Sequence, residues 1–280
     1  MTRIAVIGGG RIGEALIAGL LESGRAVKDL VVVETHPDRA ELIADRLGVR
    51  VTASIPDAII GADLLVIAVK PGDVDTVLTQ LSKAELDSDR DQVLVSLAAG
   101  VPTARLEAKM PAGFPVVRVM PNTPMLVGQS MNVLACGRYT RPEQLAQVTD
   151  LLAAVGKVVT VPESQMDAVT AVSGSGPAYF FLVVEAMIDA GVSLGLTREI
   201  ANQLVVQTMI GSAALLEDAT QSAVELRAAV TSPAGTTAAA LRELERGGVR
   251  SAFLEALHAA KQRSAELGGV SDGPGGGSGA

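Results

Sequence analysis

The sequence contains very few aromatic, cysteine and histidine residues. Aromatic residues make up 2% of the 280 positions, tryptophan is missing, and one cysteine and two histidines are present. A single cysteine, Cys136, excludes an internal disulfide, and it has no partners for a zinc site, so we expect no metal site. Few aromatic side chains also leave few platforms on which nucleic-acid bases could stack. The core must therefore be built from alanine, valine, leucine and isoleucine.

Long basic runs and a leader-like N-terminus are missing as well. The formal net charge is −8, so we expect no nucleic-acid partner. The N-terminus enters an apolar, strand-like run within three residues, unlike a signal peptide. The most apolar later segment, 178–192, contains Glu185 and Asp189 and is too short to span a bilayer. These absences predict a soluble, cytoplasmic protein with no membrane partner.

Aliphatic sequence is abundant, and through residue 162 it is arranged as short β-branched runs between segments of helical spacing. The runs are continuous, which is typical of parallel strands covered on both faces. We therefore predict an α/β fold, with a Rossmann-type, mainly parallel sheet domain over 1–162. The predicted strands lie within 3–10, 29–34, 49–54, 63–71, 92–100, 116–124, 131–137 and 157–163.

Residues 163–268 contain helical patterns and no convincing strand. The segments 178–195 and 200–216 are apolar almost all round, which is typical of helices buried in a large core or against another subunit. We therefore expect an all-α domain that binds substrate and forms a homodimer. The low-complexity end, 269–280, predicts a disordered tail.

A glycine pattern, G-x-G-x-x-G, lies directly between the first predicted strand and a helix. In such a loop the first glycine permits a tight turn, the second lets the backbone approach a pyrophosphate, and the third lets the helix pack closely. The pattern predicts a dinucleotide site, the alternative being a glycine turn used only for packing. The predicted loop contacts are Gly8, Gly9, Gly10, Arg11, Ile12 and Gly13.

Glu34 ends the second predicted strand, about twenty residues after the last glycine, where such sites place an acid. A carboxylate there accepts both ribose hydroxyls of NADH and repels the 2′-phosphate of NADPH. Arg11, His36 and Arg39 lie close in sequence. Each could approach that phosphate or remain a solvated surface residue. Glu34 favours NADH and leaves NADPH open.

Two later strand ends supply further candidate coenzyme contacts. Ala68, Val69, Lys70 and Pro71 follow the fourth strand, and Asn122 lies in the turn after the sixth. Because ligands bind outside the carboxyl ends of parallel strands, Lys70 could face the coenzyme or the substrate, or be an ordinary surface lysine. Asn122 is either a contact or a turn former.

Two polar, glycine-containing segments lie in the helical half. The segment 173–177, SGSGP, predicts a helix cap or a coenzyme-facing loop. The segment 231–237, TSPAGTT, opens an alanine-rich helix. The free N–H groups and partial positive charge of a helix N-terminus suit a carboxylate.

Five segments follow one another in the order IGGGRIGEAL, AVKP, RVMPNTP, AVSGSGPAYFF and TSPAGTT. In these segments the chain resembles the pyrroline-5-carboxylate reductase family, and the resemblance extends to about residue 268. The resemblance rests mainly on SGSGPAY and on SPxGTT, because many dehydrogenases share the glycine motif. It implies reduction of L-1-pyrroline-5-carboxylate to L-proline with NADPH or NADH, the last step of proline biosynthesis. It also implies a dimer interlocked through the helical domain, which in several members assembles into a decamer.

The resemblance places the substrate on the loop Ser232, Ala234, Gly235, Thr236 and Thr237. Thr237 matches the threonine that bonds the ring nitrogen. We expect it to act as the catalytic residue by orienting the protonated imine, since a neutral hydroxyl is too weak an acid to donate the proton. Many members have glycine where this chain has Ala234. If that position needs a positive φ, alanine costs on the order of 1 kcal/mol.

Two other functions remain open at this point. Another imine reductase or a β-hydroxyacid-type dehydrogenase would share the architecture. Such dehydrogenases use a lysine on a helix of the C-terminal domain, and this chain has no lysine between Lys157 and Lys261. A non-catalytic, NAD(P)H-sensing Rossmann protein would not need the hydroxyl-rich loop.

Overall fold

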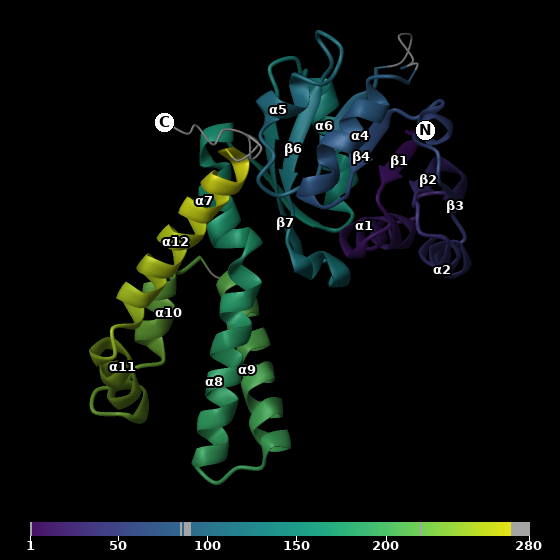
Figure 1. Cartoon of the computed structure of the whole chain (residues 1–280). Coiled ribbons are helices and arrows are strands. Elements are labelled where there is room, and N and C mark those ends of the chain that lie inside the picture. The colour runs from purple at the N-terminus through teal and green to yellow at the C-terminus, as the bar shows by residue number, and fades with distance from the viewer. Residues whose placement is uncertain (1, 85, 87–90, 219, 270–280) are drawn as a thin grey trace, which may run out of the picture. The chain divides into compact units, whose positions relative to one another are not determined.

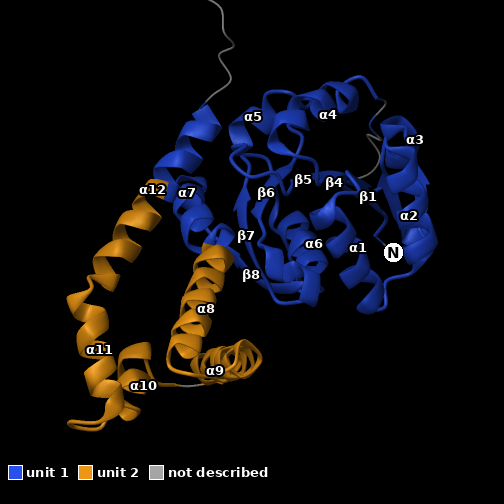
Figure 2. Cartoon of the chain, turned by 60° about the horizontal axis from the view of Figure 1, so that its bottom comes forward, with its two compact units in different colours: residues 1–175, 260–280 blue, residues 176–259 orange. Residues whose placement is uncertain are grey.

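The structure, a computed structural model, describes residues 2–84, 86, 91–218 and 220–269. The chain forms two compact units: Met1–Ser175 with Ala260–Ala280, called the sheet unit, and Gly176–Ala259, called the helical unit (Figure 2). The units divide later than the predicted domain boundary at 162/163, which stays a prediction. The predicted tail, 269–280, lies outside the described residues except for Gly269, which ends the last helix.

The sheet unit contains one eight-stranded sheet in the order β3-β2-β1-β4-β5-β6-β7-β8 (Figure 1). Every neighbouring pair is parallel except β6 with β7, so the predicted mainly parallel sheet is confirmed. All eight predicted strands are present. They are β1 (Ile4–Ile7), β2 (Leu30–Val33), β3 (Arg50–Thr52), β4 (Leu64–Ile67), β5 (Val93–Ser96), β6 (Val116–Met120), β7 (Ser130–Cys136) and β8 (Gly156–Thr160).

Helices cover both faces of this sheet. Ile4 and Val6 of β1 join one apolar cluster, and Ala5 and Ile7 join the other, because successive side chains of a strand point to opposite faces. The first cluster contains residues of α1 (Arg11–Glu22), α2 (Pro37–Leu47) and α6 (Pro142–Ala153). The second contains residues of α3 (Ile55–Ile59), α4 (Val74–Leu81) and α5 (Thr103–Glu107).

A buried ion pair joins β6 to the segment that follows β8. Arg118 is 3% exposed, and its Nη1 donates to Oε1 of Glu163 at 2.5 Å. Glu163 begins a 3₁₀ turn (Glu163–Gln165) that leads into α7 (Met166–Val169). Asp167 of α7 accepts a hydrogen bond from Ser264 of α12 (Val249–Gly269) at 2.7 Å. The last turns of α12 therefore belong to the sheet unit.

Cys136 lies at the end of β7, where it pairs with Val117 of β6. Its side chain is half-buried, and this burial raises the pKa of the thiol because it disfavours the thiolate. The position agrees with the role of a small apolar residue in the packing of the sheet.

Among its described residues, the helical unit contains helices and no strand. Helices α8 and α9 pack along each other. Gly191 of α8 lies against Ala201 of α9, and a Cβ added to Gly191 would lie 3.1 Å from the Cβ of Ala201. Neighbouring apolar side chains on α8 are nevertheless exposed: Phe180 by 62%, Phe181 by 67% and Leu182 by 65%. The helices are α8 (Gly176–Ser193), α9 (Arg198–Asp218), α10 (Ala223–Ala229), α11 (Thr236–Arg246) and the first part of α12.

The argument from length against a membrane span was wrong. The apolar segment is part of a continuous helical run, Glu163–Ser193, which within the described residues is long and apolar enough to cross a membrane. The run is longer than expected because only a π-helical turn, Thr170–Gly174, and the bend at Ser175 separate α7 from α8. Length and composition alone do not decide what covers this helix.

Candidate functional site

The predicted coenzyme site lies where the direction of the strand order reverses. The chain passes from β1 outward to β2 and β3, then returns to the other side of β1 to form β4. The carboxyl ends of β1 and β4 are held together, since the N–H of Ala68 donates to the carbonyl of Ile7 at 2.8 Å. Crevices at such reversal points are the usual ligand sites of open α/β sheets.

The glycine loop after β1 needs glycine for two separate reasons. Gly8 has φ +112°, and an added Cβ would lie 2.8 Å from the carbonyl oxygen of Ala68. An added Cβ at Gly13 would lie 2.1 Å from the carbonyl oxygen of Gly8, so α1 could not pack against the loop. The first and third glycines therefore serve the turn and the close helix contact that the pattern predicts.

Gly10 has a different surrounding. A Cβ added there would meet none of the described atoms within 4 Å. Gly10 is the N-cap of α1, and no side chain in the described part of the chain caps it. The first N–H groups of α1 therefore lack intrahelical partners and can bind an anion. An open approach to a helix N-terminus fits the pyrophosphate of a dinucleotide.

A cavity of about 440 Å³ opens beside this loop. Lys70 contributes to its wall, which brings the end of β4 to the same place as the glycine loop and the end of β2. The predicted contacts that line it are Gly8, Gly10, Glu34, Ala68, Val69 and Lys70; those that do not are Gly9, Arg11, Ile12, Gly13, Pro71 and Asn122. All twelve coenzyme contacts remain predictions.

Sequence reasoning missed part of the cavity wall. Thr76 and Gln80 of α4 line it, and so does Thr35 after β2. The spacing of the apolar residues in α4 could have indicated Thr76 and Gln80. Its buried side chains are Val74, Val77, Leu78 and Leu81. That pattern leaves the positions of Thr76 and Gln80, four apart, on another face of the helix.

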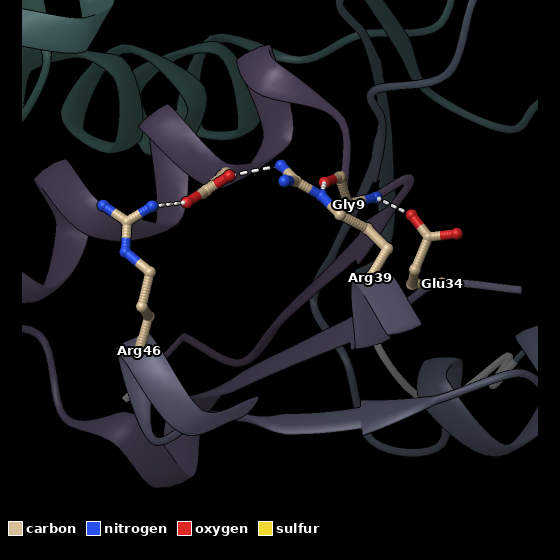
Figure 3. Close-up of polar contacts among 5 residues, drawn as sticks. Gly9, Glu34, Arg39 and Arg46 are labelled. Carbon is tan, nitrogen blue, oxygen red and sulfur yellow. Dashed lines mark hydrogen bonds and ion pairs between the residues drawn. The ribbon is translucent and has the colours of Figure 1, made fainter. Parts of the chain in front are cut away.

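Glu34 is held by two backbone donors, of which Gly9 is drawn in Figure 3. The N–H of Gly9 donates to Oε2 at 3.2 Å, and the N–H of His36 donates to Oε1 at 2.9 Å. An added Cβ at Gly9 would lie 2.9 Å from Oε2 of Glu34 and 2.3 Å from Cδ1 of Ile43. The second residue of the loop thus positions the acid at the end of β2.

Arg39 is directed toward the loop backbone. Its Nε donates to the carbonyl of Gly9 at 2.9 Å, and its Nη2 forms an ion pair with Oε2 of Glu14 on α1. Arg46 binds the other oxygen of Glu14 at 2.6 Å (Figure 3). Arg39, one of the candidate phosphate partners, is therefore already paired.

Asn122 joins three segments of the sheet unit. Its Oδ1 accepts from the N–H of Met131 at 2.9 Å, and its Nδ2 donates to the carbonyl of Ser173 at 3.2 Å. Ser173 lies in the π-helical turn, and Gly174 next to it leaves only 2.3 Å between an added Cβ and Cε of Met120. Ser173 and Gly174 are therefore helical and not part of a loop, and Gly174 permits close packing, while the cap and the coenzyme-facing role of the segment stay predictions.

The hydroxyl-rich loop opens α11 in the helical unit. Gly235 is the N-cap residue, and no side chain of the described chain caps the helix, which leaves the first N–H groups free. The N–H of Gly235 donates to the carbonyl of Ser232 at 3.1 Å and closes a tight turn. Ser232 and Thr236 are exposed, and Thr237 is half-buried.

Ala234 adopts a left-handed backbone conformation with φ +59°, as no other non-glycine residue among those described does. The condition stated for Ala234 in the sequence analysis is thus met, because an alanine occupies a position with a positive φ. The left-handed region costs a residue with a Cβ roughly 1 kcal/mol or more. Such strain persists where the surrounding structure or a function requires that conformation.

The fold, the glycine loop and the cavity beside it define a Rossmann-type dinucleotide-binding protein. Two models of known families match separate parts of the chain. Residues 3–100 match the family model "NADP oxidoreductase coenzyme F420-dependent", and residues 163–267 match "Pyrroline-5-carboxylate reductase dimerisation".

Individual relatives extend this match to nearly the whole chain. It is 54% identical to a pyrroline-5-carboxylate reductase of Mycobacterium tuberculosis and 56% identical to that of Mycobacterium leprae, covering 95% of this chain and 97% of each relative. The solved pyrroline-5-carboxylate reductase of Coxiella burnetii superposes with a TM-score of 0.90 at 36% identity, over 95% of this chain and 98% of that one. The chain belongs to the pyrroline-5-carboxylate reductase family. It is an NAD(P)H-dependent oxidoreductase.

Proposed function

We propose that this chain reduces L-1-pyrroline-5-carboxylate to L-proline by hydride transfer from NAD(P)H, the last step of proline biosynthesis. The single observation that carries the proposal is the loop 232–237. It opens a helix without a side-chain cap among the described residues and holds Ala234 at φ +59°. It does so in a chain whose helical half matches the dimerisation domain of this family.

The coenzyme binds in the cavity beside the glycine loop. The free N–H groups at the start of α1 hold the pyrophosphate, which approaches through the open space at Gly10. Glu34 accepts hydrogen bonds from the adenosine ribose, and Lys70 lies on the cavity wall formed by the end of β4. The bound nicotinamide supplies the hydride, and the protein supplies position and electrostatics.

The substrate binds at the start of α11. It is a five-membered cyclic imine that carries a carboxylate, and the free N–H groups of the helix N-terminus stabilise that negative charge. The hydroxyls of Ser232 and Thr236 are exposed and add hydrogen bonds. The strained turn at Ala234 directs these donors to one place.

Thr237 binds the ring nitrogen and acts as the catalytic residue by orienting it. The imine nitrogen is basic enough to arrive protonated, so its N–H donates to the hydroxyl oxygen of Thr237. A neutral hydroxyl is a poor proton donor, and none is required. Most of the rate enhancement then comes from holding the hydride donor and the acceptor carbon in a reactive geometry.

The chain acts as a homodimer through its helical half, with a decamer as a further assembly, and it acts in the cytoplasm. The exposed apolar side chains of α8 and α9 support an interface between copies, because a charge-poor apolar surface of this kind is typical of obligate interfaces. Packing against another copy, rather than against lipid, covers the long apolar helix.

The proposal is tested by mixing the purified protein with pyrroline-5-carboxylate and NADH or NADPH and recording the loss of nicotinamide absorbance. We expect Thr237→Ala to lower kcat by about 10–100-fold, because misplacing a reacting group can cost about 100-fold. Coenzyme affinity is expected to stay within twofold, and Thr237→Ser is expected to restore most of the rate since it keeps the hydroxyl.

Three outcomes contradict parts of this proposal. No oxidation of either coenzyme, despite measurable coenzyme binding, would favour an NAD(P)H-sensing protein. Oxidation with other imines or with ketoacids, but not with pyrroline-5-carboxylate, would favour a different reductase. Unchanged kinetics in Thr237→Ala would remove Thr237 from the mechanism.

A further inference from the structure

The cavity wall presents an acid, and not an arginine, where the adenosine ribose of the coenzyme binds. Both oxygens of Glu34 accept one backbone hydrogen bond, from Gly9 and from His36. A carboxylate oxygen has two lone-pair sites, so each keeps one for a ribose hydroxyl. The two backbone donors hold the carboxylate in place before any coenzyme arrives.

Arg39, the first arginine after Glu34 in the sequence, is engaged elsewhere. Arg39 lies in the first turn of α2, directly after the segment that carries Glu34 and His36. Its guanidinium donates to the carbonyl of Gly9 and pairs with Glu14 of α1 (Figure 3). The Glu14 side chain is only 15% exposed, and it also binds Arg46. The negative charge of Glu14 thus holds Arg39 on the side of the loop that faces α1.

No arginine among the described residues lines this cavity, and Arg11 of the glycine loop is not among its lining residues. Lys70 lines the cavity, but it follows β4, and β1 separates β4 from β2. His36 lines the cavity beside Glu34. Sites that accept a 2′-phosphate generally offer it an arginine, whereas an acid at this strand end selects the free 2′-hydroxyl.

We propose that Glu34 makes this chain an NADH-preferring reductase, and that Glu14 reinforces the preference as a positioning residue that withholds Arg39 from a 2′-phosphate. The inference rests on the proposed function, which leaves the two coenzymes open. A 2′-phosphate carries between one and two negative charges at neutral pH, and it would approach a fixed carboxylate while the guanidinium of Arg39 remains paired.

The test uses two fragments that differ only in the 2′-phosphate, adenosine 5′-monophosphate and adenosine 2′,5′-bisphosphate, titrated calorimetrically into the full chain. We expect the monophosphate to bind at least about tenfold more tightly, a difference of roughly 1.4 kcal/mol. Glu34→Gln is expected to bring the two affinities within about threefold, because it removes the charge and keeps the shape.

The positioning role of Glu14 is tested by substitutions that release Arg39 from it. Glu14→Ala is expected to improve binding of the bisphosphate about threefold or more without weakening the monophosphate, and Glu14→Gln to give a smaller gain, because its amide still accepts from Arg39. The matched control is Arg46→Gln, which removes the other partner of Glu14 and is expected to leave the ratio unchanged. Circular dichroism checks that each variant is folded.

The double variant Glu14→Ala/Arg39→Gln separates positioning from a general loosening of the loop. The gain in bisphosphate affinity is expected to vanish, because it comes from the released guanidinium of Arg39. A wild-type chain that binds the bisphosphate equally or more tightly would overturn the preference, and a gain that survives in the double variant would overturn the role of Glu14. Failure of both fragments to bind would instead contradict the proposed coenzyme site itself.

Discussion

The sheet unit and the helical unit bury their apolar residues to very different extents. Strands β1, β2, β4 and β5 are buried along their whole length. In the strongly apolar helix α8, the buried residues are Gly176 and Ile188, and in α9 the buried residue is Ala201. The sheet unit covers its own core with helices on both faces, whereas the helical unit needs another surface to cover its side chains.

The largest expected effect concerns the glycine loop of the sheet unit. Gly13→Ala places a Cβ against the carbonyl of Gly8, so we expect a fall in Tm and a loss of coenzyme affinity of about 100-fold or more, roughly 2.7 kcal/mol. Gly10→Ala is the control, since its Cβ meets no described atom within 4 Å. It should keep the wild-type Tm and still weaken coenzyme binding, because the methyl group occupies the approach to α1. Equal Tm values for both variants would contradict the close-packing role of Gly13.

The next effect concerns the self-association of the helical unit. Phe181→Asp puts a charge on the exposed apolar side of α8, where the wild-type side chain is 67% exposed. Because burying a phenylalanine contributes about 1.5–3 kcal/mol, we expect the dissociation constant of the dimer to rise by roughly tenfold to 100-fold or more. Sedimentation velocity measures the change.

The matched control for this substitution lies in the sheet unit. Leu42 of α2 is 45% exposed, and Leu42→Asp introduces the same charge on an exposed apolar position. It should leave the oligomeric state unchanged if the interface belongs to the helical unit. Dissociation by Leu42→Asp, with none by Phe181→Asp, would reverse the assignment.

A smaller effect is expected at Ala234. Glycine adopts φ +59° without the steric cost of a Cβ, so Ala234→Gly should raise the free energy of unfolding by about 0.5–1 kcal/mol. Ala240→Gly, at an exposed position inside α11, should lower it by about 1 kcal/mol because glycine disfavours a helix. Urea unfolding measures both variants. If Ala234→Gly also lowered the free energy of unfolding, the left-handed conformation at Ala234 would carry no strain.

The smallest effect concerns a surface ion pair of the sheet unit. Arg105 binds Asp75 at 2.6 Å, and its hydrogen bond holds the pKa of the Asp75 carboxyl below its usual value. A lowered pKa in the folded state stabilises the protein above the usual aspartate pKa, and this contribution is lost as the pH falls through the lowered value. Because Asp75 is 42% exposed, we expect Arg105→Gln to cost only about 0.5 kcal/mol near neutral pH. Urea unfolding at several pH values should show this difference disappearing in acid; a constant difference would exclude the ion pair as its source.

The sequence predicted the features that depend on local patterns. Continuous β-branched runs identified all eight strands, and the glycine spacing identified the turn between β1 and α1. The partners of Arg39 could not be predicted, because its contact with Glu14 depends on how α1 and α2 lie on the same face of the sheet. The link between Asn122 and Ser173 likewise joins residues 51 positions apart.

The helical half shows the same limit. Its helices and its exposed apolar faces followed from composition, yet the π-helical turn at 170–174 did not, because SGSGP is also typical of a cap or a loop. The positive φ of Ala234 could be stated only as a condition, since the alanine itself argues against a left-handed conformation. Which surface covers α8 lies beyond any pattern within one chain.

The single cysteine at the end of β7 makes the chain convenient for site-directed labelling. Burial raises the pKa of the Cys136 thiol, so at neutral pH it reacts slowly with maleimides. A cysteine introduced on an exposed helix would be labelled first, and Cys136→Ser would remove the remaining background. One dye on α8 and one on α2 would then report, by energy transfer, the distance between these two helices.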